Sequence, residues 1–213
     1  VGGMNAVADS QNLGRKAGFV PFRVGMWIGK DASPNRLKEN PFTPSAESLI
    51  LKAQEGIPTR GSTIAPFSTC PWCGDASVGK VASYEVTSEG WSAPRPRVAT
   101  HCANSECRFS AEVPFTAVDD DIYLNPPTIL LGTVDKFVQV AYNHSARHAG
   151  DDYHEYTVRR LLGMEVLEDD GAPFPPDVVI QDELHLLSGP LGTMAGLLET
   201  ALTVAWQETS NHR

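Results

Sequence analysis

The stretch Asp177–Gly192, DVVIQDELHLLSGPLG, is the most informative part of this chain. Its apolar start predicts a short buried β-strand over Val178–Gln181. Two adjacent acids, Asp182 and Glu183, follow that strand directly. Carboxylates are costly at the end of a buried strand, and ligands bind at the carboxyl ends of parallel strands. The pattern therefore predicts that Asp182 holds Mg²⁺ and Glu183 polarises an attacking water. Two solvated acids at a strand end are the alternative interpretation.

Strand patterns alternate with helix patterns along the rest of the chain, which predicts an α/β fold with a parallel sheet. We expect strands at Phe22–Ile28 and Thr128–Leu131. The expected helices are Pro44–Gln54 with Ser45 as a possible N-cap, Val134–Ala149, Tyr156–Leu167 and Leu191–Trp206. In the last helix the apolar spacing predicts a buried stripe made of Leu191, Met194, Leu198, Leu202 and Ala205.

The chain has four cysteines, in two short-spaced pairs. Cys70 and Cys73 belong to CPWCG, and Cys102 and Cys107 belong to CANSEC. Four thiolates on two turns suit one tetrahedral structural zinc ion, with disulfides as the alternative. Between the pairs, alternating residues predict the hairpin strands Val81–Thr87 and Arg97–Thr100, so residues 60–117 read as a β-rich zinc ribbon. We interpret His101 as a neighbour of the site that is not a ligand.

One motif in this region is misleading. GDASVGK, residues 74–80, fits the G-x-x-x-x-G-K pattern of a phosphate-binding loop, but Val81 stands where the Mg²⁺-binding hydroxyl is needed. A cysteine turn precedes it in place of a buried strand. We therefore expect that these 213 residues lack the phosphate-binding loop, and that the chain is a fragment or a split subunit.

Several motifs resemble one helicase family. The order Asp-Glu-Leu-His at residues 182–185 resembles the DExH box of superfamily 2 helicases and translocases, and GTVDKF at 132–137 is similar to a helicase segment that contacts nucleic acid. Together with PFRVGMWIGKDASPN at 21–35, CPWCG at 70–74 and IQDELHLLSGPLGT at 180–193, these motifs resemble the DrmA-type helicases of the DISARM anti-phage defence system.

The resemblance implies roles for individual residues. Asp182 and Glu183 would bind Mg²⁺ and ATP and catalyse hydrolysis, and His185 would link the site to the following motif. Thr133 and Lys136 would contact the nucleic-acid backbone. Ser188 matches the first residue of the next helicase motif and is the candidate for coupling hydrolysis to movement, although Gly189 and Pro190 depart from that motif.

The resemblance also implies an architecture and a set of partners. The fold would be a partial RecA-like, P-loop-NTPase-type parallel sheet: residues 1–59 and 118–213 form the lobe, and the ribbon of 60–117 is inserted. The expected partners are nucleic acid, with DNA favoured over RNA, the remaining helicase lobes or a subunit that carries the phosphate-binding loop, and other defence proteins. The isolated chain would be inactive. The alternative function is a non-catalytic zinc-ribbon module, for nucleic-acid binding or assembly, on a RecA-like scaffold.

Charge and hydropathy bear on two of the expected partners, nucleic acid and membranes. Residues 118–213 hold 5 basic and 16 acidic side chains, so the field of the chain does not favour non-specific binding to nucleic acid. We interpret Asp119–Asp121 and Glu168–Asp170 as solvated loop charges. No apolar run approaches 18 residues and no signal segment stands out, which predicts a cytoplasmic protein with no membrane contact.

Overall fold

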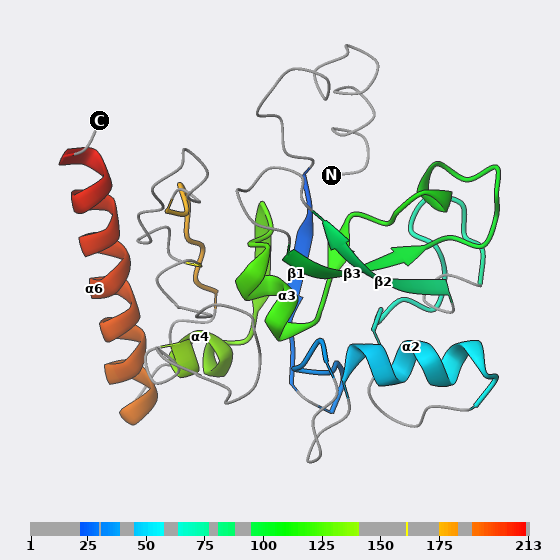
Figure 1. The fold of residues 1–213 in the computed structure, drawn as a ribbon. Coiled ribbons are helices and arrows are strands. Elements are labelled where there is room, and N and C mark those ends of the chain that lie inside the picture. Colours follow the sequence, from blue (N-terminus) through cyan, green and yellow to red (C-terminus); the bar gives the residue numbers. More distant parts are fainter. Residues whose placement is uncertain are drawn as a thin grey trace, which may run out of the picture. The chain divides into compact units, whose positions relative to one another are not determined.

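A computed structural model gives the fold (Figure 1). It describes residues 22–29, 31–38, 45–57, 64–76, 81–87, 95–140, 161, 175–182 and 189–211. The chain divides into two compact units, Val1–Leu131 and Gly132–Arg213, and each is described by itself. The division into a lobe with a ribbon inserted at 60–117 stays a prediction.

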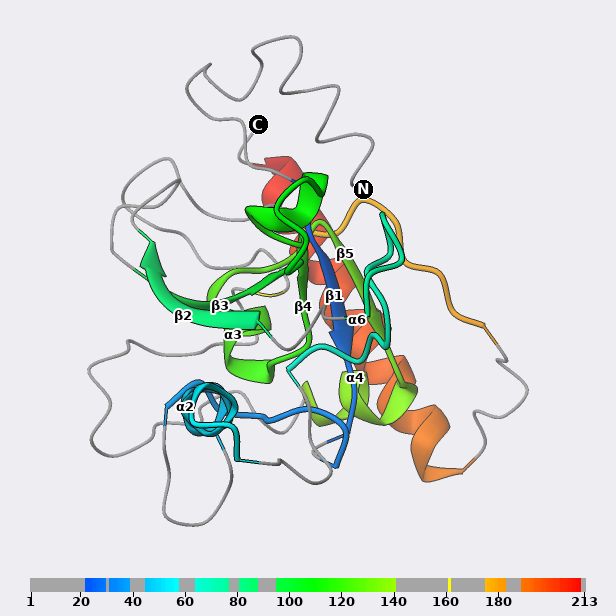
Figure 2. The ribbon, with the colours of Figure 1, turned by 90° about the vertical axis from the view of Figure 1, so that its right-hand side faces the viewer.

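A three-stranded sheet lies at the centre of the first unit. Its strands are β1 (Val24–Trp27), β4 (Phe115–Thr116) and β5 (Ile129–Gly132), in the order β4-β1-β5. β1 pairs in parallel with β4, with Val24 opposite Phe115, and Figure 2 shows the strands side by side. The predicted α/β class with a parallel sheet is confirmed. β1 and β5 lie within one or two residues of their predicted positions, whereas β4 was not predicted.

Gly25 allows the close approach of a neighbouring segment to the central strand. A Cβ atom at this position would lie 2.5 Å from Cγ of Pro127 and 3.0 Å from Cδ1 of Leu130. Both distances are too short for an unshifted carbon, and the proline ring cannot swing away as a flexible side chain would. The absence of a side chain at Gly25 therefore lets the 127–130 segment pack against β1.

The ribbon is built on an antiparallel hairpin of β2 (Val81–Thr87) and β3 (Arg95–His101). Its register runs from Val81 opposite His101 to Thr87 opposite Arg95. The prediction for β2 is confirmed, while β3 begins two residues earlier and ends one residue later than the predicted Arg97–Thr100. The hairpin brings the end of β3 to the second cysteine pair.

Helix α2 (Ala46–Gln54) begins where the sequence predicted an N-cap. The Ser45 hydroxyl accepts a hydrogen bond from the Ser48 amide at 3.1 Å, and the Ser48 hydroxyl accepts one from the Ser45 amide at 3.2 Å. This reciprocal pair satisfies two amide donors that the first turn would otherwise leave unpaired. The helix buries Leu49 and Ile50 against the rest of the unit, while Leu51 is exposed.

The interpretation of Asp119–Asp121 as solvated loop charges is wrong. These residues open helix α3 (Asp119–Leu124), and Asp121 is 0% exposed. Its carboxylate accepts hydrogen bonds from the Arg23 guanidinium at 3.1 Å and from the Thr116 hydroxyl at 2.7 Å. The Asn125 side-chain amide donates to its other oxygen at 2.9 Å. Asp121 therefore joins α3 to β4 and to the residue just before β1, because a buried carboxylate persists only when it is paired.

The second unit contains α4 (Val134–Val140) and α6 (Pro190–Asn211), which pack against each other. Of the predicted stripe, Leu202 is buried and Leu198 is half-buried, and the side chains of Leu191, Met194 and Ala205 lie outside the described ones. Ala195 is also buried, whereas Leu197 is exposed. Apart from Leu161, the predicted helix Tyr156–Leu167 lies outside the described residues. Across the described part of the chain, no helix has both the length and the apolar character to cross a bilayer.

Candidate metal centre

The first cysteine pair lies on a tight turn between residues 70 and 75. The Cys70 amide donates to the Asp75 carbonyl at 2.7 Å, and the Gly74 amide donates to the Cys70 carbonyl at 2.9 Å. Gly74 has a φ of +77°, which is a conformation that glycine adopts without strain. The turn reverses the chain directly after Cys73, so Cys70 and Cys73 present their sulfurs on the same side.

The second pair follows β3. The Cys102 amide donates to the Phe109 carbonyl at 2.9 Å, which closes a loop around the pair. Cys107 is the N-cap of a short 3₁₀ helix, η2 (Arg108–Ser110), and its sulfur accepts a hydrogen bond from the Phe109 amide at 3.4 Å. An amide directed at the sulfur stabilises a thiolate.

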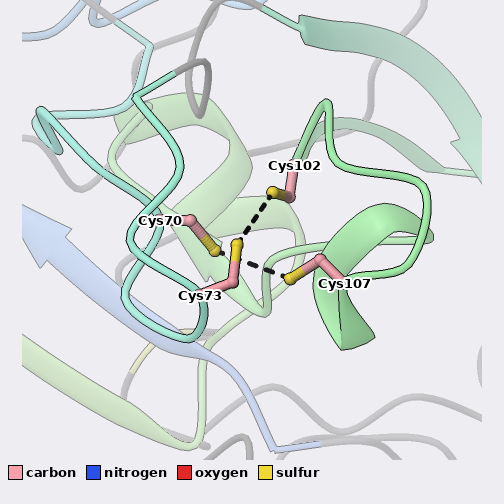
Figure 3. A group of neighbouring side chains, drawn as sticks. All are labelled: Cys70, Cys73, Cys102 and Cys107. Carbon is pink, nitrogen blue, oxygen red and sulfur yellow. Dashed lines mark hydrogen bonds between the residues drawn. The ribbon is translucent and has the colours of Figure 1, made fainter.

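The four sulfurs converge between the two turns (Figure 3). All four lie within 4.8 Å of one another, and the cysteines are free thiols. Two close separations join one turn to the other: 3.6 Å between Cys73 and Cys102, and 3.8 Å between Cys70 and Cys107. A zinc ion with four sulfurs at 2.3 Å would place them about 3.8 Å apart. The residues therefore fit a closed four-thiolate metal site.

The metal centre shares a hydrophobic core with the sheet. Phe109 and Val113 from the second turn pack with Phe115 of β4, and Phe67 before the first turn packs edge-on against Phe115, with ring centroids 4.5 Å apart. The buried members of this cluster are Cys70, Cys102, Cys107, Phe109, Val113, Phe115 and Ala117. Since β4 pairs with β1, the cysteine turns are fixed to the central strand through this core.

The thiols differ in their readiness to ionise. Burial raises the pKa of Cys102 to about 12 and also raises the pKa of Cys107. Burial acts in the same direction at Cys70, but hydrogen bonds from the backbone of Cys73 and Trp72 outweigh it and lower that pKa to about 7. The thiolate of Cys70 is thus stabilised, while the buried thiols of Cys102 and Cys107 keep their protons. A divalent cation would remove this restriction, because its charge favours the thiolate form that binds it.

His101 is not among the metal-binding atoms. One ring nitrogen, Nε2, is 3.0 Å from the Ser83 hydroxyl, and Nδ1 bonds the Ala111 carbonyl. The ring thus joins β2 to the loop that carries Cys102 and Cys107. The interpretation of His101 as a neighbour rather than a ligand agrees with this geometry.

Thr133 lies where β5 ends and α4 begins. It is exposed, and its carbonyl accepts hydrogen bonds from the amides of Lys136 at 3.0 Å and Phe137 at 3.4 Å. Its place at the carboxyl end of a sheet strand is a position where ligands commonly bind. The Lys136 side chain is buried. Contacts of Thr133 and Lys136 with nucleic acid stay a prediction.

The acidic segment differs from its predicted structure. Residues 175–182 are described, but they form no strand. Val178 is 73% exposed and Ile180 is 87% exposed, so the prediction of a buried strand at Val178–Gln181 is wrong for this structure. A strand forms only where its amides and carbonyls find a paired neighbour, and the described residues provide none here.

Asp182 is exposed at the end of this segment. Glu183, His185 and Ser188 lie outside the described residues. The catalytic and coupling roles of all four residues therefore stay predictions.

The sequence did carry a signal for the burial of Asp121. Val118, Asp121, Ile122 and Asn125 follow the spacing i, i+3, i+4, i+7 of one helix face, and the first three of them are 0% exposed. The apolar residues on either side of the acid place Asp121 on the buried face of α3. A run of three aspartates hides this pattern, because such runs are usually solvated.

Comparison with known proteins gives one informative match. The chain is 30% identical over 202 residues to the DISARM protein DrmA of Bacillus paralicheniformis. No family model matches the chain, and no solved structure matches it. The match covers 85% of this chain and 17% of the length of the relative. The resemblance that the sequence motifs indicated is confirmed: over most of its length, the chain is similar to a segment of DrmA.

Proposed function

We propose that the chain is part of an ATP-dependent superfamily 2 helicase or translocase that acts on nucleic acid in bacterial anti-phage defence. The observation that carries the proposal is the 30% identity to a DISARM protein over 85% of the chain. Because the chain spans 17% of that relative, the activity belongs to the whole protein, with the phosphate-binding loop supplied outside these residues. DNA is the favoured nucleic acid, the cytoplasm the expected location, and other defence proteins the expected partners.

The proposed chemistry is hydrolysis of ATP. Asp182 would anchor the Mg²⁺ ion of the nucleotide, and Glu183 would orient and deprotonate the attacking water. Bound Mg²⁺ would neutralise charge on the phosphates. His185 and Ser188 would pass the state of this site to the nucleic-acid contacts. Thr133, exposed at the carboxyl end of β5, supports this proposal because its hydroxyl can donate to a phosphate oxygen.

The proposed role of the cysteine centre is structural. One Zn²⁺ held by Cys70, Cys73, Cys102 and Cys107 would close both turns and fix the β2–β3 hairpin to the core around Phe115. Zinc would supply no catalysis, because four protein ligands leave no open coordination position.

A second candidate function has its own supporting observation. The cysteine centre is assembled, whereas Val178 and Ile180 before the acidic pair are exposed. This contrast favours a non-catalytic zinc-ribbon module, for binding nucleic acid or for assembly, on a RecA-like scaffold. Such a module would keep its binding partner when the acidic pair is removed, and it would lose the partner when zinc is removed.

The test compares acid substitutions in the full-length protein that contains this chain. Glu183→Gln should reduce ATP turnover at saturating ATP and DNA by roughly 10²–10⁴-fold, the range for loss of a positioned general base, while ATP binding persists. Asp182→Ala should weaken Mg²⁺–ATP binding itself. Asp177→Asn is the matched control, because this exposed acid belongs to the same segment and lies outside the motif. Equal turnover in Glu183→Gln and wild type would exclude the motor and leave the binding module.

A further inference from the structure

The four thiols of the metal centre are not equally accessible. Cys70 and Cys102 are each 3% exposed and Cys107 is 6% exposed, whereas Cys73 is an exposed residue. The exposure of Cys73 follows from its place on the outer part of the first turn, where Trp72 is also exposed. A small reagent in solvent therefore approaches the site from the side of Cys73, the exposed residue of the four.

Cys73 has a close neighbour on the second cysteine turn. Its sulfur lies 3.6 Å from that of Cys102, and the second short separation, 3.8 Å, joins Cys70 to Cys107 (Figure 3). Both pairs join one cysteine turn to the other. A disulfide needs a sulfur–sulfur bond of about 2.05 Å, so each pair would have to close by less than about 2 Å.

We propose that this centre is a site of reversible oxidation by peroxides, with Cys73 as the residue attacked and Cys102 as the residue that resolves the product. The proposal builds on the proposed zinc centre and extends it to a modification of the protein. The Cys73 thiolate attacks one peroxide oxygen, the O–O bond breaks, the other oxygen leaves as hydroxide and takes up a proton to become water, and Cys73 becomes a sulfenic acid. The Cys102 thiolate then attacks the Cys73 sulfur and releases hydroxide, which a proton converts to water. Two thiols lose two electrons in total, and hydrogen peroxide takes them up to give two waters.

The geometry gives this reaction a defined outcome for the fold. A Cys73–Cys102 disulfide removes two of the four ligands, so zinc leaves. The new bond also ties the first turn to the second, so the two turns stay together when the metal is lost. A second peroxide can join Cys70 to Cys107 in the same way. A dithiol reductant would reverse both steps and restore the site.

The first test follows the loss of free thiols under hydrogen peroxide, with a thiol-reactive chromophore as the readout, because a variant that lacks one ligand is expected to release its zinc. Cys73→Ser is compared with Cys70→Ser, the matched control, which removes one thiol from the same turn but keeps Cys73 and Cys102. The first oxidation should be about tenfold or more slower in Cys73→Ser than in Cys70→Ser. Equal rates in the two variants would overturn the assignment of Cys73.

The second test needs no variant, so it holds if either substitution prevents folding. Wild-type chain is treated with less than one equivalent of peroxide, with and without dimedone, a reagent that traps sulfenic acids. Cleavage after Trp72 and after Glu106 separates the two cysteines of each pair, so mass spectrometry can assign every bond. We expect the dimedone adduct on Cys73 and, without dimedone, a Cys73–Cys102 disulfide. A first adduct on another cysteine, or a Cys70–Cys73 disulfide, would overturn the proposal.

The proposed zinc centre and the proposed oxidation site can be contradicted independently of each other. A purified chain without bound metal would contradict the zinc centre, whereas the same bond mapping on the reduced metal-free chain still tests the oxidation site. A zinc-bound chain that resists peroxide would contradict the oxidation site alone.

Discussion

The cysteine turns of the first unit and the acidic segment of the second were both predicted from short motifs, yet they differ in how far they are assembled. The turns bury three of their four thiols and bring all the sulfurs within 4.8 Å. In the acidic segment, the described residues 175–182 form no strand, and Ile180 is 87% exposed. The difference teaches that a sequence motif predicts a site when the residues that hold the site in place lie nearby in the sequence or on one hairpin.

Hydrogen bonds within each turn explain the first case. Cys70 bonds Asp75, and Cys102 bonds Phe109, so each turn is determined by a few consecutive residues. A strand such as 178–181 has no such local support, because its amides and carbonyls need a second strand. The predictions below test this comparison, beginning with the largest expected effect.

Removal of one thiol should abolish the metal centre. The wild-type chain should hold about one zinc per molecule, and Cys102→Ser should release it, because structural zinc contributes about 10–16 kcal/mol in small domains and depends on all of its ligands. Metal analysis gives the stoichiometry, and hydrogen exchange over Arg95–His101 should become faster in the variant. A wild-type chain without zinc, whose four thiols all titrate freely in the folded state, would contradict this prediction.

Removal of the buried carboxylate should be the next largest effect. Asp121→Ala leaves Arg23 and Thr116 without their partner, and breaking such a buried pair costs about 3–5 kcal/mol in the free energy of unfolding. Urea unfolding measures the loss. Asp31→Ala is the control, since this exposed acid should change stability by less than about 0.5 kcal/mol. Similar values for the two variants would mean that Asp121 is solvated, as the acid run suggested.

Zinc affinity should depend steeply on pH. The pKa of Cys102, raised to about 12, and the raised pKa of Cys107 keep both thiols protonated between pH 7 and 8. Zinc must displace both protons, so affinity should fall about 100-fold per unit as pH decreases, or about 2.7 kcal/mol. Below pH 7 the protonation of Cys70, whose pKa is about 7, should steepen the fall. Chelator competition at several pH values measures it. A slope near zero would mean that the thiols are already ionised without metal.

The smallest effect should come from the acidic segment. Ile180→Ser should change the free energy of unfolding by less than about 0.5 kcal/mol, because the side chain is already in solvent. Ile122→Ala, at a position that is 0% exposed, should cost about 2–5 kcal/mol. Urea unfolding of both variants gives the comparison. A cost above about 2 kcal/mol for Ile180→Ser would show that the segment is buried in solution, and the contrast between the two regions would disappear.

Much of the fold followed from local rules. The N-cap at Ser45 was predicted from its side chain, β2 from alternation, and the cysteine centre from paired spacing, because each depends on residues close in the sequence or on one hairpin. The two-residue strand β4 was missed because its pairing with β1 joins residues about 90 positions apart. Asp121 was misread because the run of three aspartates hid its place on a buried helix face, although its partner Arg23, 98 residues away, could not be predicted from local sequence.

The acidic pair shows a motif that was recognised in the sequence while the structure around it could not be predicted. Its motif was recognised, but the apolar residues before it indicate a strand only if another strand is present to pair with them. Neither the spacing nor the composition of residues 177–192 indicates where the neighbouring strand lies in the sequence. For this reason the chemistry of Asp182 and Glu183 is best tested in the full-length protein.

The position of β4 has a consequence for exchanging the ribbon between proteins. Phe115 and Thr116 lie only eight and nine residues after Cys107, yet they form a strand of the central sheet beside β1. The ribbon and the sheet therefore share an edge strand as well as a core. The ribbon therefore cannot be replaced as a separate unit: a replacement that ends after the last cysteine turn must keep β4 and the ring of Phe115, or the chain loses part of its sheet.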